Sequence, residues 1–173
     1  ALKLMEAVVE KTGVQNRNDL HAVVSEVDWL SHLDSRMTIK CDTTIGVCQD
    51  RDLRHTHFSS LTVKNAVVDQ FRDAGIARPS VDTENPDMIL HTYLHRGKCT
   101  LYKVWSGEDS MHKRGYRDTV HRAALRETTA AGLILISGWN GEQSALVDPM
   151  CGSGTLAIEA ALIATNTAPG LLR

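Results

Sequence analysis

Several features are scarce or missing in the 173-residue sequence, and each absence excludes a class of protein. No apolar run approaches the roughly twenty residues that a membrane-spanning helix requires. The N-terminus lacks the basic, apolar and small-residue regions of a secretory signal. The four cysteines form no Cys-x-x-Cys pair, so we interpret them as reduced thiols. We therefore expect an intracellular protein, located in the cytoplasm, or in an organelle if a transit peptide has been removed.

Prolines are also few, at four, and hydrophobic residues make up 42% of the chain, which is typical of soluble globular proteins. The length allows one ordinary domain, or one small domain and part of another. A net charge of -2 excludes a uniformly basic nucleic-acid protein, but the charge is unevenly distributed. Residues 51–122 carry 12 Lys/Arg against 9 Asp/Glu, and both flanking regions are acidic. An RNA backbone would be expected along this middle region.

A glycine-containing stretch at residues 146–155 is the clearest motif. A short apolar run ends at Asp148, a turn of small residues follows, and residues 156–164 are rich in Ala, Leu and Ile. This pattern predicts a strand, a tight loop and a helix. Glycine lets the backbone approach a ligand closely, and a helix N-terminus offers free N–H groups. Asp148 can accept hydrogen bonds from an amine or hydroxyl.

Two other motifs compete for the same residues. Residues 152–157 also fit the Gly-x-Gly-x-x-Gly/Ala fingerprint of dinucleotide enzymes, which expects an acid about twenty residues later. No acid follows Glu159, but a nicotinamide or flavin enzyme remains an alternative. The Gly-x-Ser-x-Gly elbow of serine hydrolases fails, because Cys151 and Thr155 occupy the glycine positions.

Periodicity predicts most of the remaining elements. Residues 2–9 have apolar positions at helical spacing, and residues 37–43 alternate as a strand does. We expect a helix capped by Ser59 or Ser60 and stopped by Gly75. Residues 88–95 and 99–105 should form a hairpin, and residues 121–137 a buried helix. No metal site is expected, since His55 and His57 lack nearby acids or thiols and Cys99 lies past the turn from His91 and His95.

The octapeptide Asp-Pro-Met-Cys-Gly-Ser-Gly-Thr at 148–155 resembles the S-adenosylmethionine-binding motif of the THUMP-containing RNA guanine-N2 methyltransferases. Further stretches resemble that family in the right order, at residues 64–71, 78–82, 112–117, 126–131 and 168–171. The likeness runs from about Val24 to the last residue. The sequence departs from the family at Val104, Ala124 and Thr129, which stand where Asp, Pro and Leu are usual.

The resemblance implies an α/β fold, in which a THUMP-type RNA-binding module is followed by the first strand, loop and helix of a class I, Rossmann-like methyltransferase domain. We expect an N-terminal helical segment and the THUMP module in residues 1–107, a basic linker in 108–120, and the start of the methyltransferase domain in 121–173. S-adenosyl-L-methionine would be held by Asp148, Pro149, Cys151, Gly152, Ser153, Gly154 and Thr155. Structured RNA, either rRNA or tRNA, would contact Arg51, Arg54, Lys64, Lys113, Arg114, Tyr116 and Arg117.

Within the basic linker, Lys and Arg can neutralise phosphates and Tyr116 can stack on an unpaired base. The alternative is a charged interdomain loop that touches nothing. The family's second-strand acid and its Asn-Pro-Pro-Tyr-type loop do not occur in the sequence, so we interpret the chain as a fragment that is inactive alone. Catalytic residues are expected beyond Arg173. A THUMP-type adaptor without chemistry, and a tRNA methyltransferase, remain rival interpretations.

Overall fold

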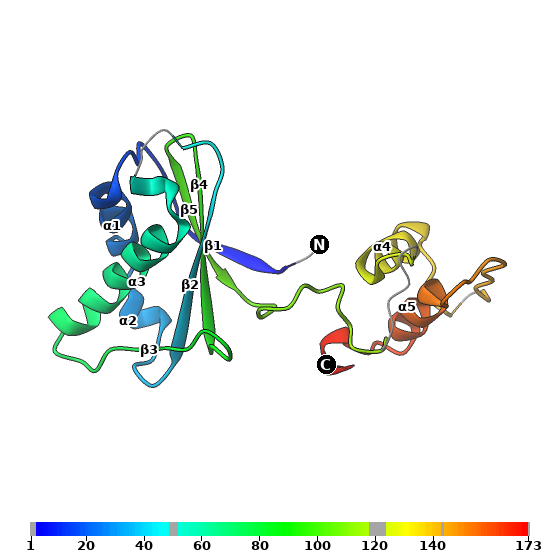
Figure 1. Ribbon diagram of the computed structural model, residues 1–173. Helices are drawn as coiled ribbons and strands as arrows, with labels where there is room; N and C mark the ends of the chain where they lie inside the picture. Colours follow the sequence, from blue (N-terminus) through cyan, green and yellow to red (C-terminus); the bar gives the residue numbers. More distant parts are fainter. Residues whose placement is uncertain (1–2, 49–51, 118–123, 143, 173) are drawn as a thin grey trace. The chain divides into compact units, whose positions relative to one another are not determined.

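The computed structural model describes residues 3–48, 52–117, 124–142 and 144–172, which fold into two compact units. One unit comprises Leu4–Glu108, and the other is built on Asp109–Arg173. Each unit has its own packed elements (Figure 1). No helix in the described ranges combines the length and apolar character needed to cross a bilayer.

A mixed five-stranded sheet forms the centre of the unit Leu4–Glu108. The strand order is β1-β5-β4-β2-β3, with antiparallel pairing of β1 with β5 and of β5 with β4. The pairing of β4 with β2 and of β2 with β3 is parallel. The strands are β1 (Met5–Thr12), β2 (Thr38–Ile45), β3 (Ser80–Val81), β4 (Met88–His95) and β5 (Lys98–Val104).

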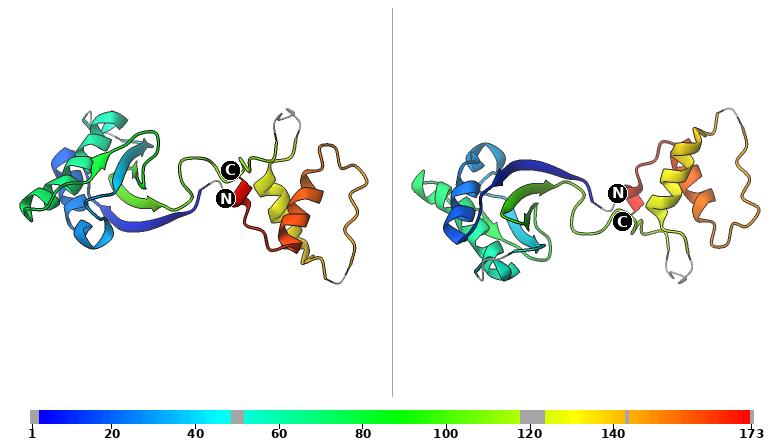
Figure 2. Two further views of the ribbon diagram at one scale, coloured as in Figure 1. Left: turned by 90° about the horizontal axis from the view of Figure 1, so that it is seen from below. Right: turned by 90° about the horizontal axis from the view of Figure 1, so that it is seen from above.

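Three helices cover one face of this sheet, as Figures 1 and 2 show, and the core lies between the two layers. They are α1 (Arg17–Ser25), α2 (Trp29–His32) and α3 (Thr56–Asp73), with a 3-10 turn, η1 (Asp52–Arg54), before α3. Apolar residues spaced four apart on α3 face inward, because i and i+4 lie on one helix face. The largest fully buried apolar side chains are Trp29, Phe71, Leu20, Ile39, Leu53, Leu90 and Leu101.

The N-terminal segment corrects one expectation, because residues 5–12 form strand β1 and not a helix. The register of β1 against β5 shifts between Ala7 and Val9, which marks a bulge. Two consecutive residues, Val8 and Val9, both pack against the core. A β-bulge changes the direction in which side chains point, so two consecutive apolar residues can face the core. In the sequence, such a pair resembles the spacing of apolar residues in a helix.

The central predictions are confirmed. Strand β2 occupies the alternating stretch, and β4 and β5 form the expected hairpin. Its two-residue turn has positive φ at Arg96 (50°) and Gly97 (73°), as a type I′ hairpin turn requires. Helix α3 begins at Thr56, earlier than expected. Ser59 and Ser60 therefore lie inside it, where their hydroxyls bond the Leu53 carbonyl (3.4 Å) and the Thr43 hydroxyl (2.9 Å).

The second unit contains α4 (Glu127–Ser137), α5 (Thr155–Ala164) and a final 3-10 turn, η2 (Pro169–Leu172). Helices α4 and α5 pack together, and Gly138 ends α4 with φ 75° as predicted. The expectation of a helix from residue 121 is wrong for residues 124–126, and 121–123 lie outside the described residues. The expectation of burial is also wrong, because Leu133, Leu135 and Ile136 are 51, 64 and 86% exposed. No described element covers that side of α4.

The strand predicted at residues 146–148 is likewise not formed. Val147, its central residue, is 82% exposed. A parallel strand of this kind is stable only between neighbouring strands. The described part of the second unit contains no strand with which it could pair. The predicted loop and helix are present without it.

Candidate cofactor loop and basic segment

The glycine loop leads from Asp148 into α5. The Asp148 carboxylate accepts a hydrogen bond from the Met150 backbone N–H at 3.2 Å, and the Gly154 N–H donates to the Cys151 carbonyl at 2.7 Å. Gly152 and Gly154 have φ of 52° and 73°, in the left-handed region that favours glycine. These contacts turn the chain sharply so that it enters α5 at Thr155.

The N-terminus of α5 is open to a ligand. Gly154 is the N-cap residue, and no side chain caps the helix there. A Cβ added at Gly154 would meet no heavy atom within 4 Å, so the space beside the loop is free. The first-turn N–H groups of a helix favour negative charge or a hydrogen-bond acceptor. The loop therefore has the form of a cradle for a small polar ligand.

Arg117 joins this loop to the start of α4. Its Nη1 donates to the Glu127 carboxylate at 3.1 Å and to the Leu125 carbonyl at 3.4 Å. Its Nη2 donates to Ser153 Oγ at 3.3 Å and also to Thr155 Oγ1. The Arg117 and Glu127 side chains are only 10% and 9% exposed. The Arg117 guanidinium thus connects the glycine loop to Glu127 at the start of α4.

Arg114 and Tyr116 are fixed to the same face of α5, one turn after Thr155, through Glu159. The Arg114 guanidinium makes two hydrogen bonds to the Glu159 carboxylate, at 3.3 and 3.2 Å. The Tyr116 hydroxyl donates to the same carboxylate at 3.0 Å. Burial, together with this hydrogen bond, raises the pKa of Tyr116 well above its usual range. The phenol therefore stays protonated and serves as a donor to Glu159.

These contacts alter the expectation for the predicted basic linker. Lys113 is exposed, and its ammonium pairs with Asp109, four residues earlier, at 2.9 Å. Arg114 and Arg117 are buried against carboxylates of α5 and α4, so they do not form part of an exposed linker. Glu127 and Glu159 are the site residues that the sequence reasoning missed. Their only signal was their place inside motifs that carry the family resemblance.

The remaining predicted RNA contacts belong to the unit Leu4–Glu108. Arg54 is exposed, and its Nε donates to the Cys48 carbonyl at 3.1 Å. Lys64 is half-buried on α3. Arg51 lies outside the described residues. In the ranges that the structure describes, no group of three or more His, Cys, Asp or Glu side chains has a geometry suited to a metal ion.

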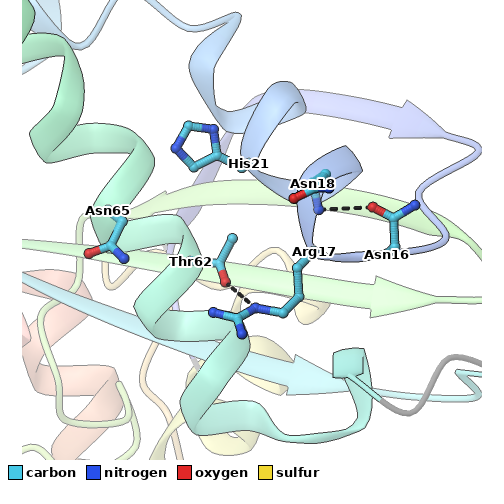
Figure 3. Close-up of a pocket in the computed structure, with 6 residues that line it drawn as sticks. All are labelled: Asn16, Arg17, Asn18, His21, Thr62 and Asn65. Atoms are coloured by element: carbon cyan, nitrogen blue, oxygen red, sulfur yellow. Dashed lines mark hydrogen bonds between the residues drawn. The ribbon is translucent and has the colours of Figure 1, made fainter.

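A polar pocket between α1 and α3 was not predicted from the sequence (Figure 3). Asn16 and Asp19 form a reciprocal capping box at the start of α1, a helix that was not predicted from the sequence. That spacing of an N-cap residue and an acid three positions later is a recognisable signal for a helix start. The pocket is lined by Asn16, Arg17, Asn18, His21, Thr62 and Asn65.

Two family models match the sequence. The THUMP domain model matches residues 14–104, and the model described as an RMKL-like methyltransferase domain matches residues 114–173. These ranges correspond to the two compact units. The match to the second model includes Arg114, Arg117 and the whole glycine loop.

Named relatives cover most of this chain. The chain is 46% identical over 163 residues to the ribosomal RNA large subunit methyltransferase K/L of Saccharophagus degradans, and 42% identical over 163 residues to that of Desulfotalea psychrophila. Both matches cover 92% of this chain, but only 21% and 22% of the respective relatives. A solved structure described as a putative methyltransferase complexed with S-adenosylhomocysteine is also similar, with 26% identity and a TM-score of 0.76. The match covers 99% of this chain and 44% of the other.

Proposed function

Because this chain belongs to the THUMP-domain family and carries an RMKL-like methyltransferase domain, we propose that it acts as part of a longer S-adenosylmethionine-dependent RNA methyltransferase. The reaction would make N2-methylguanosine in large-subunit ribosomal RNA. The unit Leu4–Glu108 would bind RNA, and the second unit would supply the first part of the cofactor site. The chain spans only about a fifth of the two named relatives, at 21% and 22%, so their activity is carried over as a proposal.

The observation that carries this proposal is the cradle formed by the glycine loop and the N-terminus of α5. Open space beside Gly154 and an uncapped helix start fit the methionine end of the cofactor. Asp148 would accept a hydrogen bond from its amine, and the loop from Pro149 to Thr155 would surround its carboxylate and sulfonium side. The solved methyltransferase with S-adenosylhomocysteine supports this choice of cofactor.

S-adenosylmethionine supplies an activated methyl group, so the protein's part is to align the methyl with the guanine amine and to accept a proton. In this chain, Arg117 would keep Ser153 and Thr155 in place while the cofactor is bound. No described residue is assigned to the guanine or to its proton. We therefore propose that the 173-residue chain alone does not methylate RNA.

Methylation assays on a longer protein that contains this sequence would test the proposal. Ribosomal RNA would be incubated with labelled S-adenosylmethionine, and its nucleosides separated by chromatography and identified by mass spectrometry. The expected product is N2-methylguanosine, and the isolated chain should give no more label than a protein-free control. Methylation of adenine, or of tRNA alone, would contradict the substrate assignment.

Cofactor binding separates the remaining alternatives. Calorimetry with S-adenosylhomocysteine should show binding by the longer protein, and titration with NADH should show none. Binding of RNA without either ligand would favour a non-catalytic adaptor. Binding of NADH in place of S-adenosylhomocysteine would favour a dinucleotide enzyme.

A further inference from the structure

The pocket between α1 and α3 has the size of a small-ligand site and a wholly polar lining. Its volume is about 350 Å³, within the range of roughly 300–1,000 Å³ that is common for small-ligand pockets. Every residue that lines it carries a polar side chain. Figure 3 shows Arg17 reaching from α1 toward Thr62 on α3, with His21 and Asn65 along the same opening.

Arg17 gives this pocket an uncompensated positive charge. Its Nε donates to Thr62 Oγ1 at 3.2 Å, and its guanidinium carbon lies 5.9 Å from the centre of the Phe58 ring. Among the described residues, no carboxylate lies within ion-pair distance of Arg17. The terminal nitrogens are therefore held in a defined position without a partner, which suits a phosphate.

The nearby acids are occupied elsewhere. The Asp19 carboxylate accepts backbone N–H groups of Gln15 and Asn16, at 2.9 and 3.3 Å, as part of the cap of α1. Asp69 accepts from His21 at 3.3 Å and pairs with Arg72 at 3.0 Å. Neither of these carboxylates pairs with Arg17.

Amide groups and an aromatic ring lie beside this charge. The side chains of Asn18 and Asn65 make no hydrogen bond within the described residues, so each can offer both a donor and an acceptor. Phe58 is 48% exposed, with the rings of His55 and His57 at 5.7 and 5.9 Å. An exposed aromatic ring next to an arginine is a platform on which a base can stack.

From these contacts we propose that the pocket binds one nucleotide of an unpaired RNA segment. The phosphate would bind Arg17, and the sugar and base edges would bind Asn18 and Asn65. The base would stack on Phe58, which lies outside the pocket lining and next to Arg17. This inference rests on the proposed RNA-binding function of the unit Leu4–Glu108, and it locates a contact in that unit outside the basic residues named from the sequence.

RNA titrations of the 173-residue chain would test this site. The probe is a fluorescently labelled single-stranded oligoadenylate, measured across a series of salt concentrations. Arg17→Gln should weaken binding about tenfold, the effect of losing one charge-assisted hydrogen bond. It should also reduce the slope of log affinity against log salt by about 0.7, as expected for one phosphate contact on a single strand.

The second variant removes both free amides, as Asn18→Ala with Asn65→Ala. It should weaken binding while leaving the salt slope unchanged, because amides release no counterions. Arg36→Gln is the matched control, since Arg36 is 88% exposed and pairs with Asp34 outside the pocket. Thermal unfolding of each variant would check that the fold is kept.

Side-chain signals give an independent measurement. In the ¹⁵N-labelled chain, the Arg17 Nε–H and the Asn18 and Asn65 amide signals should move on adding oligoadenylate, and the Arg36 Nε–H should not. If Arg17→Gln and the double variant both bind like the Arg36 control, the pocket is not an RNA site. If these signals move with inorganic phosphate but not with RNA, it is a simple anion site, which also overturns the proposal.

A failure of the proposed RNA-binding function would give a different experimental result. A wild-type chain that bound no RNA would overturn both the pocket and the RNA-binding role of the unit Leu4–Glu108. RNA binding that depends on Lys64 or Arg54, but not on Arg17, would keep that role and reject the pocket alone.

Discussion

Arg114 and Glu159 form a buried two-point ion pair, in which the side chains are 8% and 1% exposed. The pair joins the segment before α4 to α5, 45 residues later. Tyr116 donates to the same carboxylate, so three side chains share one buried site. Among the described residues of the second unit, the buried apolar side chains are Ala130, Ile134 and Ala160, so this polar contact is one of its few buried interactions.

Breaking this pair should destabilise the second unit. Arg114→Ala leaves the Glu159 charge buried without its ion-pair partner, which typically costs roughly 3 to 5 kcal/mol. Hydrogen exchange of the α5 amides should accelerate accordingly. Lys113→Ala is the control, because the Lys113–Asp109 pair is exposed and should contribute less than about 1 kcal/mol. Equal exchange rates in the two variants would contradict this role of Arg114.

Arg117 should affect cofactor binding by holding the loop in position. In the longer protein, Arg117→Ala should raise the Kd for S-adenosylhomocysteine about tenfold or more, since Ser153 and Thr155 lose a shared donor. In the single variant, the Glu127 carboxylate stays buried without its ion-pair partner. The double variant Arg117→Ala with Glu127→Ala removes this carboxylate as well, so the free energy of unfolding should recover. Cofactor affinity should stay low in that double variant. Recovery of both properties would show that Arg117 acts only on stability.

Gly154 should be required for cofactor binding, and Gly138 supplies a matched comparison. The φ angles of Gly154 and Gly138 are 73° and 75°, and an added Cβ would meet no heavy atom within 4 Å at either position. Alanine at each site should therefore cause similar backbone strain. In the longer protein, calorimetry should show lost cofactor binding for Gly154→Ala alone. Equal effects would mean that strain, and not the ligand's approach, explains the loss.

Two thiols should make the unit Leu4–Glu108 less stable in alkali. Burial raises the pKa of Cys41 from 9.0 to about 12 and that of Cys99 from 9.0 to about 11. The unfolded chain therefore loses these protons first, and stability falls as the pH rises above about 9. Each pKa unit by which the folded state exceeds the unfolded state corresponds to about 1.4 kcal/mol of stability lost at high pH.

Urea unfolding at increasing pH would measure this dependence. The alkaline loss should become shallower in Cys99→Ala and in Cys41→Ala, each compared with its own stability at neutral pH. Cys151 is exposed, so Cys151→Ser should leave the dependence unchanged. An identical pH dependence in all four proteins would show that other groups cause the loss.

Local patterns were sufficient for the elements that depend on near neighbours. The hairpin follows from alternating residues around Arg96 and Gly97, and the end of α3 follows from Gly75. Strand β1 could not be predicted, because its pairing of Met5 with Val104 is distant in sequence and its bulge disturbs the alternation. Pairing with β5 therefore overrode the helical spacing of the apolar residues in this segment.

The glycine loop lies where the sequence predicts it, whereas the exposure expected of Arg114 and Arg117 is not found. A count of charges treats Arg114 and Arg117 as available to RNA. Their partners, Glu159 and Glu127, lie in the acidic part of the chain, and only the fold brings them together. The pocket beside Arg17 was missed for a similar reason, since α1 and α3 supply its residues from separate parts of the sequence.

The uncovered side of α4 has a consequence for handling the chain in solution. Leu133, Leu135 and Ile136 present adjacent apolar surface to water, and such patches promote self-association. We expect the sedimentation coefficient of the isolated chain to rise with protein concentration, and mild detergent to reverse this rise. Replacing Ile136, which is 86% exposed, by a polar residue should improve solubility with little cost to packing.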